Sequence, residues 1–198
     1  WEILHTRIKL HLIFLAKTES GRDWNLESLL KGFSHSFMKA RARYPLSLAP
    51  IYFNFAKPIR EIRKFRAKTI YIDGWESPAF FISALYAKRQ RMNLIYGYRS
   101  TQDSHRFKNI IIRKIRSSIL SQADFIVTAG SASTKAVEAM GIAPEKIITL
   151  FNPVDVSWFH SFARNHRTPV TSGHRYIYVG QLIERKNVAT ILRSFAAI

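Results

Sequence analysis

The sequence predicts an α/β fold in which helices pack on both faces of a parallel sheet. Short β-rich runs alternate with longer segments of helical period, which is typical of that class. The predicted helix ends agree with this pattern, since Pro78 suits a first helical turn and Gly141 suits the left-handed cap after a helix. We predict strands at residues 8–15, 69–72, 93–96, 125–128, 147–150 and 176–179.

Three helices are expected between these strands, at residues 78–91, 106–120 and 131–140. Residues 50–55 fit a further strand or a docked loop equally well. In the middle helix the apolar residues recur at helical spacing, which predicts a face toward the core. That face carries Phe107, Ile111, Ile115 and Ile119, and the other side of the helix carries Arg106, Arg113 and Arg116.

The sequence predicts two domains of unequal length. Residues 161–173 contain few apolar side chains together with Pro169 and Gly173, which indicates a linker. We therefore expect an N-terminal domain at residues 1–160, a linker at 161–174 and the start of a second domain at 175–198. In that second part a strand leads into a helix behind Asn187 as its cap, with Val188, Ile191, Leu192 and Phe195 on one face.

Composition limits the partners. With 31 Lys and Arg against 13 Asp and Glu, the formal charge is +18, so an anionic partner is expected among phosphate-bearing small molecules, nucleic acid or an acidic membrane. The absence of cysteine excludes disulfides, thiolate chemistry and Cys-containing zinc sites. The histidines show no His-Glu-x-x-His pattern, so we expect no metal. No apolar run approaches the ~20 residues that a bilayer requires, and we expect no membrane-spanning segment.

The segment from Tyr178 to Val188 has the features of a phosphate cradle. Gly180 ends a predicted strand, where a glycine lets the backbone approach a ligand. Lys186 lies just before a predicted helix, whose first N–H groups favour an anion. An ordinary solvated lysine at a helix start is the competing interpretation.

The same segment resembles the signature that opens the donor domain of glycosyltransferase family 4, a retaining family with the GT-B fold of two Rossmann-like domains. The run from Ala123 to Ser131 resembles the strand of that family that lies near the linker, and Met140 to Ile147 resembles the turn that follows it. Asn152-Pro-Val-Asp155 with Phe159 is similar to a further element of the family. The resemblance extends over residues 69–198 and is loose before them.

This resemblance implies a sugar transfer from a nucleotide-diphosphate sugar, in cell-surface polysaccharide or glycolipid biosynthesis. It assigns Lys186 to the donor diphosphate, together with Gly180. Gln181 stands where the family has an arginine, and Arg185 could compensate for the lost charge. The donor phosphate itself would receive the acceptor proton, so no catalytic side chain is assigned, and neither a cofactor nor a metal is expected.

The acceptor cleft is expected where predicted parallel strands end, because open α/β folds bind ligands at that edge. Alternatively, Trp75 packs an interdomain face and Asp73 caps a helix, while Arg99 forms an ion pair with Asp103 or another carboxylate. The candidate cleft residues are Asp73, Gly74, Trp75, Glu76, Arg99, Ser100, Thr101, Gly130 and Ser131.

We expect the chain to be a piece of a longer enzyme, inactive alone. The glycine-rich loop of the family would lie before Trp1, and its Glu-x7-Glu element would lie beyond Ile198. The expected location is the cytoplasm, with the basic stretches 31–68 and 88–116 docked on an anionic membrane face and a glycan or lipid-linked molecule as acceptor.

Three further functions remain open at this point. A nucleic-acid-binding protein would use the charge, with tyrosines and phenylalanines for base stacking, but lacks a recognisable binding motif. A nucleotide-sugar epimerase could share the architecture. A sugar-binding module without catalysis would fit the replacement of arginine by Gln181.

Overall fold

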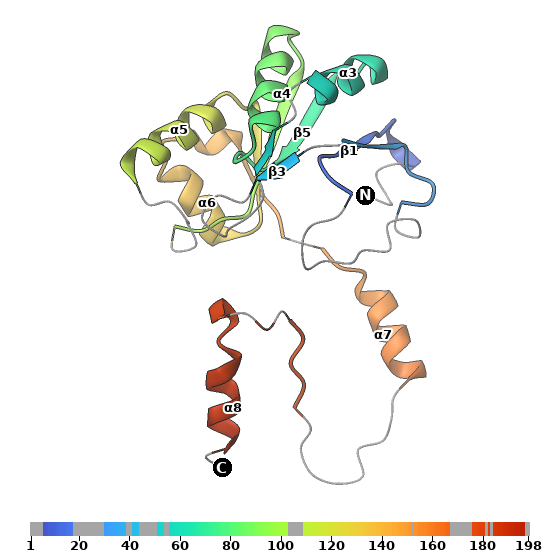
Figure 1. The fold of residues 1–198 in the computed structure, drawn as a ribbon, viewed down its shortest axis with the longest axis vertical. Coiled ribbons are helices and arrows are strands. Elements are labelled where there is room, and N and C mark those ends of the chain that lie inside the picture. Colours follow the sequence, from blue (N-terminus) through green and yellow to red (C-terminus); the bar gives the residue numbers. More distant parts are fainter. Residues whose placement is uncertain are drawn as a thin grey trace. The chain divides into compact units, whose positions relative to one another are not determined.

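The structure is a computed structural model that describes residues 6–17, 30–38, 41–43, 51–53, 56–102, 109–151, 153–166, 176–180, 182 and 184–196. At residues 41–43, 51–53 and 185 only the backbone is described. The chain divides into two units, Trp1–Asn152 and Pro153–Ile198, which we take in turn (Figure 1).

The centre of the first unit is a four-stranded parallel sheet with the strand order β5-β6-β7-β8. One register line runs across it from Ile72 through Tyr96 and Ile126 to Ile147. All four strands were predicted from the sequence, and their parallel pairing is confirmed. Their bounds are β5 (Thr69–Asp73), β6 (Asn93–Tyr98), β7 (Phe125–Thr128) and β8 (Ile147–Thr149).

Helices connect these strands in chain order: α4 (Pro78–Arg89), α5 (Ile110–Ser121), and α6 (Ser131–Glu138) followed by the short 3-10 helix η2 (Pro144–Lys146). Alternate strand residues point to opposite faces of the sheet. Ile72, Leu94, Tyr96 and Ile126 share one face and are buried in one cluster with residues of α4, α5 and α6. The hydrophobic core therefore lies between one face of the sheet and these three helices.

The second face of the sheet is open among the described residues. Tyr71, Phe125 and Ile148 lie on it and are 38%, 45% and 42% exposed. The expectation of helices on both faces is thus wrong for the described part of the chain. The reason is topological, because right-handed crossovers that always add the next strand on the same side place the connecting helices α4, α5 and α6 on one face.

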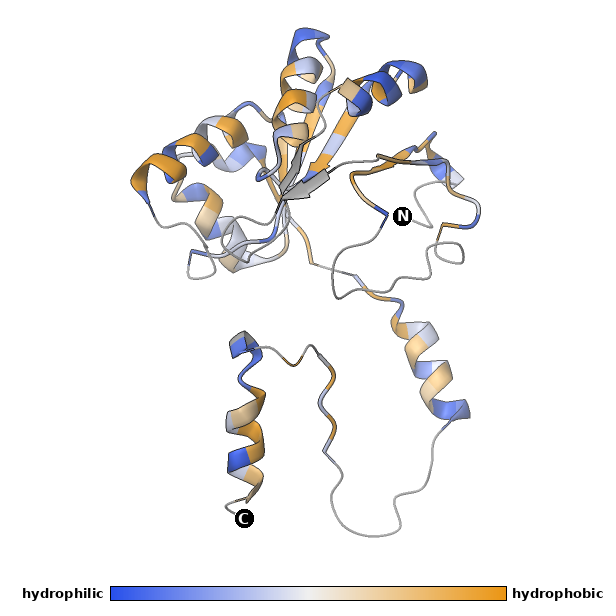
Figure 2. Ribbon diagram, in the orientation of Figure 1, coloured by the Kyte–Doolittle hydropathy of each residue, from blue (hydrophilic) through white to orange (hydrophobic). Residues whose placement is uncertain are grey.

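The assignment of faces on α5 was also wrong. Ile119 is buried as expected, but Ile111 and Ile115 are 63% and 50% exposed, while Arg116 is only 2% exposed. The first half of this helix is strongly apolar (Figure 2), so periodicity alone did not determine which side meets the core. The predicted start at residue 106 lies outside the described residues; the described helix begins at Ile110 behind Asn109, whose side chain accepts a hydrogen bond from the Ile111 N–H (2.7 Å).

Two small sheets and a helix precede the main sheet. In one, β1 (Leu12–Phe14) pairs in parallel with β2 (His35–Phe37), and in the other β3 (Arg41–Arg43) pairs antiparallel with β4 (Ile51–Phe53). The helix α3 (Ala56–Phe65) follows them. The strand expected at residues 8–15 is thus limited to three residues and joins β2 rather than the four-stranded sheet, and the ambiguous stretch 50–55 contains β4.

The second unit contains two α-helices, α7 (Val156–Asn165) and α8 (Val188–Ala196), and the 3-10 helix η3 (Glu184–Lys186). Asp155 caps α7 by accepting a hydrogen bond from the Trp158 N–H (2.8 Å). This helix includes residues 161–165 of the predicted linker, whereas residues 167–175 lie outside the described residues.

The strand predicted at residues 176–179 is not formed. A β-strand exists through hydrogen bonds to a neighbouring strand, and no described segment of this unit pairs with these residues. The helix α8 is confirmed. No helix within the described ranges is both long and apolar enough to cross a bilayer.

Candidate functional site

The candidate acceptor cleft lies at the carboxyl edge of the main sheet. Asp73 is the last residue of β5, Arg99 follows β6, and Gly130 lies between β7 and α6. Because the three strands are parallel neighbours, the predicted groups meet at one edge, where open α/β sheets bind ligands.

On the open face of the sheet this edge carries an exposed ion pair. The Arg99 guanidinium donates a hydrogen bond to the Asp73 carboxylate and another to the Tyr71 hydroxyl. The side chains of Arg99 and Asp73 are 58% and 44% exposed, so a ligand in solvent can reach both. Burial raises the pKa of Tyr71 and the Asp73 charge raises it further, while Arg99 opposes them. The hydroxyl therefore stays protonated at neutral pH and can donate or accept a hydrogen bond.

Gly97 makes room for this cluster. A Cβ atom at that position would overlap the Tyr71 hydroxyl and lie 2.7 Å from Asp73 Oδ1. Only a residue without a side chain lets Tyr71 lie across β6 and reach Arg99.

The third predicted group is tied to the second through α6. Ser133, in the first turn of that helix, donates a hydrogen bond from its hydroxyl to the carbonyl oxygen of Arg99 (3.2 Å). Gly130 has a φ of +135°, a conformation that favours glycine, and its carbonyl starts α6 by accepting a hydrogen bond from the Thr134 N–H (3.0 Å). The groups at the ends of β5 and β6 are therefore in direct contact, and the helix that follows β7 contacts the β6 group through Ser133.

A second cluster at this edge lies on the core face. The Arg116 side chain, from α5, stacks on Trp75, with 4.6 Å from its guanidinium carbon to the ring centroid. Arg116 also donates a hydrogen bond to the Tyr98 hydroxyl, which opposes the rise in the pKa of Tyr98 that burial causes. Trp75 is half-buried and packs against the core. Trp75 therefore packs within the first unit, and the alternative that it packs an interdomain face stays a prediction.

Two further candidate cleft residues, Gly74 and Glu76, shape the loop between β5 and α4. Gly74 has a φ of +136°, and a Cβ atom there would lie 2.9 Å from the ring of Phe80. The exposed Glu76 accepts a hydrogen bond from the Trp75 N–H (3.1 Å). Asp73 does not cap α4, whose N-cap is Ser77.

Three small polar residues complete this edge. Ser100 and Thr101 follow Arg99 and are half-buried, and Ser131 opens α6 with its side chain exposed. The alternative weighed for Arg99, an ion pair with Asp103 or another carboxylate, is formed with Asp73, while Asp103 lies outside the described residues.

The predicted donor site is described only in part. Lys186 is exposed at the end of η3, and α8 begins two residues later at Val188. Between them Asn187 has a φ of +51°, and its carbonyl oxygen accepts hydrogen bonds from the N–H groups of Thr190 (3.1 Å) and Ile191 (3.5 Å). The lysine therefore lies next to a helix N-terminus, whose partial positive charge favours an anion.

Of the other residues predicted to bind the donor diphosphate, only Gly180 has a described contact. Gly180 lies against Tyr178, so that a Cβ atom at this glycine would be 2.6 Å from the tyrosine hydroxyl. Gln181 lies outside the described residues, as does the side chain of Arg185.

Sequence reasoning missed Tyr71, Tyr98 and Arg116. A signal for Arg116 was present, because Ile112, Arg116 and Leu120 are spaced four residues apart along α5, which puts the arginine inside an apolar stripe. Tyr71 and Tyr98 carried no such signal, since tyrosine is common in strands.

The chain matches no protein-family model, and neither a curated protein nor a solved structure is significantly similar to it. Within the described residues, no three His, Asp or Glu side chains come together in a group that could hold a metal ion.

Proposed function

We propose that this chain is part of a retaining glycosyltransferase of the GT-B type, which transfers a sugar from a nucleotide-diphosphate sugar to an acceptor. One observation carries the proposal: at the carboxyl edge of the sheet Arg99 pairs with Asp73 across β6 and β5, and Ser133 of α6, the helix after β7, bonds to the Arg99 carbonyl oxygen. Such an edge on a parallel sheet is where an α/β protein accommodates a small ligand.

In this proposal the acceptor and the donor bind at different sites. The carboxyl edge of the main sheet receives the acceptor, with Arg99 facing an anionic or hydroxyl-rich group. The start of α8 receives the donor diphosphate, where Lys186 and the helix N-terminus stabilise the charge that develops on the leaving group. A retaining transfer in which the donor phosphate takes the acceptor proton requires positioning and electrostatic stabilisation from the protein rather than a side-chain base.

The proposal includes the partners and the location. The acceptor is a glycan or a lipid-linked molecule, and the protein acts in the cytoplasm at an anionic membrane face, without a metal or a cofactor. The basic composition supports this, because a net charge of +18 attracts both phosphates and acidic headgroups.

The test is calorimetric titration of the full-length protein with uridine and guanosine diphosphates and with their sugar derivatives. Lys186→Ala removes a charge-assisted hydrogen bond worth ~1.5–3 kcal/mol, so the affinity should fall by roughly ten- to a hundredfold. Gln181→Arg should tighten binding, because it restores a charge to the same motif. The matched control is Arg193→Ala, which removes an exposed cation from α8 about two turns further along.

An unchanged affinity in Lys186→Ala, with the protein folded, would refute the donor site. Interconversion of a nucleotide sugar without any acceptor would identify an epimerase instead. Binding to single-stranded DNA that is tighter than to any nucleotide sugar would favour a nucleic-acid-binding protein.

A further inference from the structure

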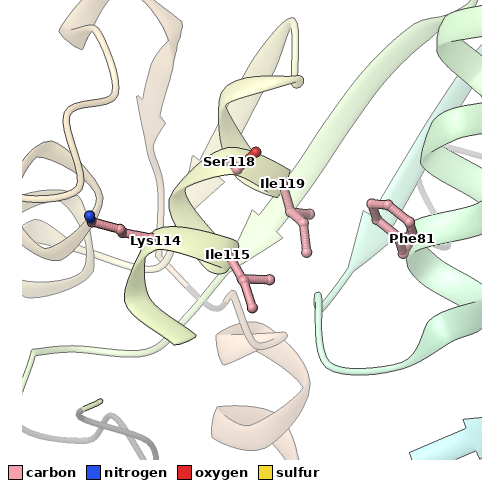
Figure 3. A pocket seen from close by; sticks show the side chains of 5 residues that line it. All are labelled: Phe81, Lys114, Ile115, Ser118 and Ile119. Atoms are coloured by element: carbon pink, nitrogen blue, oxygen red, sulfur yellow. The ribbon is translucent and has the colours of Figure 1, made fainter. Parts of the chain in front are cut away.

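The outer surface of α4 and α5 carries an apolar groove that the proposed sugar transfer does not use. Its volume is about 490 Å³, and the residues that line it are shown in Figure 3. Phe81 contributes from α4, and the other lining residues come from α5: Lys114, Ile115, Ser118 and Ile119.

Large apolar side chains extend this groove into a wider exposed patch. Leu85 lies one turn after Phe81 on α4 and is 44% exposed, and the outer side of α5 adds two more isoleucines. Isolated exposed apolar residues are ordinary, but contiguous ones mark an interaction surface. We call Phe81, Leu85, Ile110, Ile111 and Ile115 the α4–α5 patch; each of them is exposed.

The charged residues on the two helices that carry this patch are all positive. The sequences of α4 and α5 contain no Asp or Glu at all, although the chain has 13. The exposed cations on these helices are Lys88, Arg89, Arg113 and Lys114, of which Lys88 pairs with Asp124. Lys114 lines the groove itself, so apolar and basic groups form one surface.

We propose that the α4–α5 patch docks on a bilayer that contains anionic lipid, with its isoleucines and Phe81 in the headgroup–acyl boundary and Lys114 and Arg113 against the phosphates. Surface-lying helices combine apolar and basic groups in this way. The proposal specifies which face meets the membrane partner proposed above, but it does not depend on sugar transfer.

Charge and side-chain type favour a lipid surface over other occupants. A second copy would bring two basic surfaces together, and a net charge of +18 on each chain opposes that. A single-stranded nucleic acid would gain little from isoleucines, because bases stack on aromatic rings. An anionic bilayer matches both the isoleucines and the cations.

The chain contains no cysteine, so a single cysteine can report on one position. In Ile111→Cys carrying an environment-sensitive fluorophore, emission should shift to the blue and increase with vesicles of phosphatidylcholine and phosphatidylglycerol, but not with phosphatidylcholine alone. The same label in Lys135→Cys, an exposed position on α6, should stay unchanged. Equal responses at the two positions, or an equal response to neutral vesicles, would overturn the proposal.

Vesicle partitioning of unlabelled variants separates the apolar and the charge contributions. The double change Ile111→Ser and Ile115→Ser should lower partitioning by about tenfold or more. Lys114→Glu should lower it by about tenfold, whereas the charge-matched Lys135→Glu should change it by about twofold or less. All four positions are exposed, so these variants should fold.

Three further results bear on the proposal. Unchanged partitioning of the double serine variant would refute it. A concentration-dependent dimer without lipid that the serine changes abolish would assign the patch to a second copy instead. The nucleotide titration of the serine variant tells the two proposals apart, because an intact diphosphate affinity with lost vesicle binding is the result expected if both proposals hold.

Discussion

Two arginines lie at the same edge of the main sheet, one on each face, and their surroundings are opposite. Arg99 lies on the open face in an exposed pair with Asp73, whereas Arg116 lies on the core face with 2% of its surface exposed, stacked on Trp75. Arg116 stacks on the Trp75 ring and donates a hydrogen bond to the Tyr98 hydroxyl, so it holds these two side chains in place. An exposed cation at a strand end is available to a ligand. Burial therefore distinguishes the structural arginine from the candidate binding arginine.

The same difference extends to the energy that each cluster contributes. An exposed ion pair such as that of Arg99 and Asp73 contributes ~0–1 kcal/mol, because water and salt screen it. A buried arginine contributes through the packing of its long stem and through its contact with the aromatic ring. Changes on the core face should therefore affect folding more than changes on the open face.

The largest expected effect is that of Arg116→Ala. It removes the group that stacks on Trp75 and leaves a cavity beside the core, so we expect a loss of about 3 kcal/mol in the free energy of unfolding. Urea denaturation followed by circular dichroism measures it. Arg113→Ala on the exposed side of the same helix is the control and should change stability by less than about 0.5 kcal/mol. Equal effects of the two substitutions would contradict the distinction between the faces.

The sequence predicted the elements of this sheet better than their contacts. Residues 125–128 were predicted and observed as β7, because one short β-rich run is enough to define a strand. The orientation of α5 could not be predicted, since both of its sides carry isoleucines and the contact of Arg116 with Trp75 comes from another part of the chain. The strand expected at 176–179 failed for a similar reason, because a strand depends on a partner that local sequence does not specify.

Part of the candidate site was predictable in the same way. The meeting of Asp73, Arg99 and Gly130 at one edge followed from parallel pairing, which alternation of strands and helices predicts. The cluster of Tyr71 with Arg99 did not, because it requires Gly97 on the neighbouring strand at the right register.

A second, smaller effect should appear at alkaline pH on the core face. Burial raises the pKa of Tyr96 from its ordinary value of 10.0 to about 12. The folded state therefore holds this proton more tightly than the unfolded chain does, so its contribution is complete below pH 10 and is lost as the pH rises from 10 to 12. The loss amounts to about 2 kcal/mol and should be measurable as a fall in the free energy of unfolding.

Tyr96→Phe should remove this part of the alkaline loss and cost nothing at neutral pH. The Tyr96 hydroxyl is buried and has no hydrogen-bond partner among the described residues, so its removal leaves no other polar group unsatisfied. Tyr71→Phe on the open face is the comparison and should reduce the alkaline loss less, because Tyr71 is 38% exposed. Identical alkaline curves for wild type and Tyr96→Phe would show that this hydroxyl does not carry the effect.

The smallest expected effect on stability belongs to the open face, in Gly97→Ala. The new methyl group would overlap the Tyr71 hydroxyl, and Tyr71 can turn outward because it is partly exposed. We expect a cost of about 1 kcal/mol, within the range of mild overpacking, together with loss of the hydrogen bond between Tyr71 and Arg99. Urea denaturation measures the change in the free energy of unfolding, and titration of the Tyr71 hydroxyl by ultraviolet absorbance reports whether its contact with Arg99 is lost.

Two changes to the pKa of Tyr71 are expected in this variant. Losing the Arg99 contact removes an interaction that lowers this pKa, whereas turning outward removes the burial that raises it, and burial is the larger cause. The pKa of Tyr71 should therefore move down toward its ordinary value of 10.0 in Gly97→Ala, and an unmoved titration would show that Gly97 does not control this cluster.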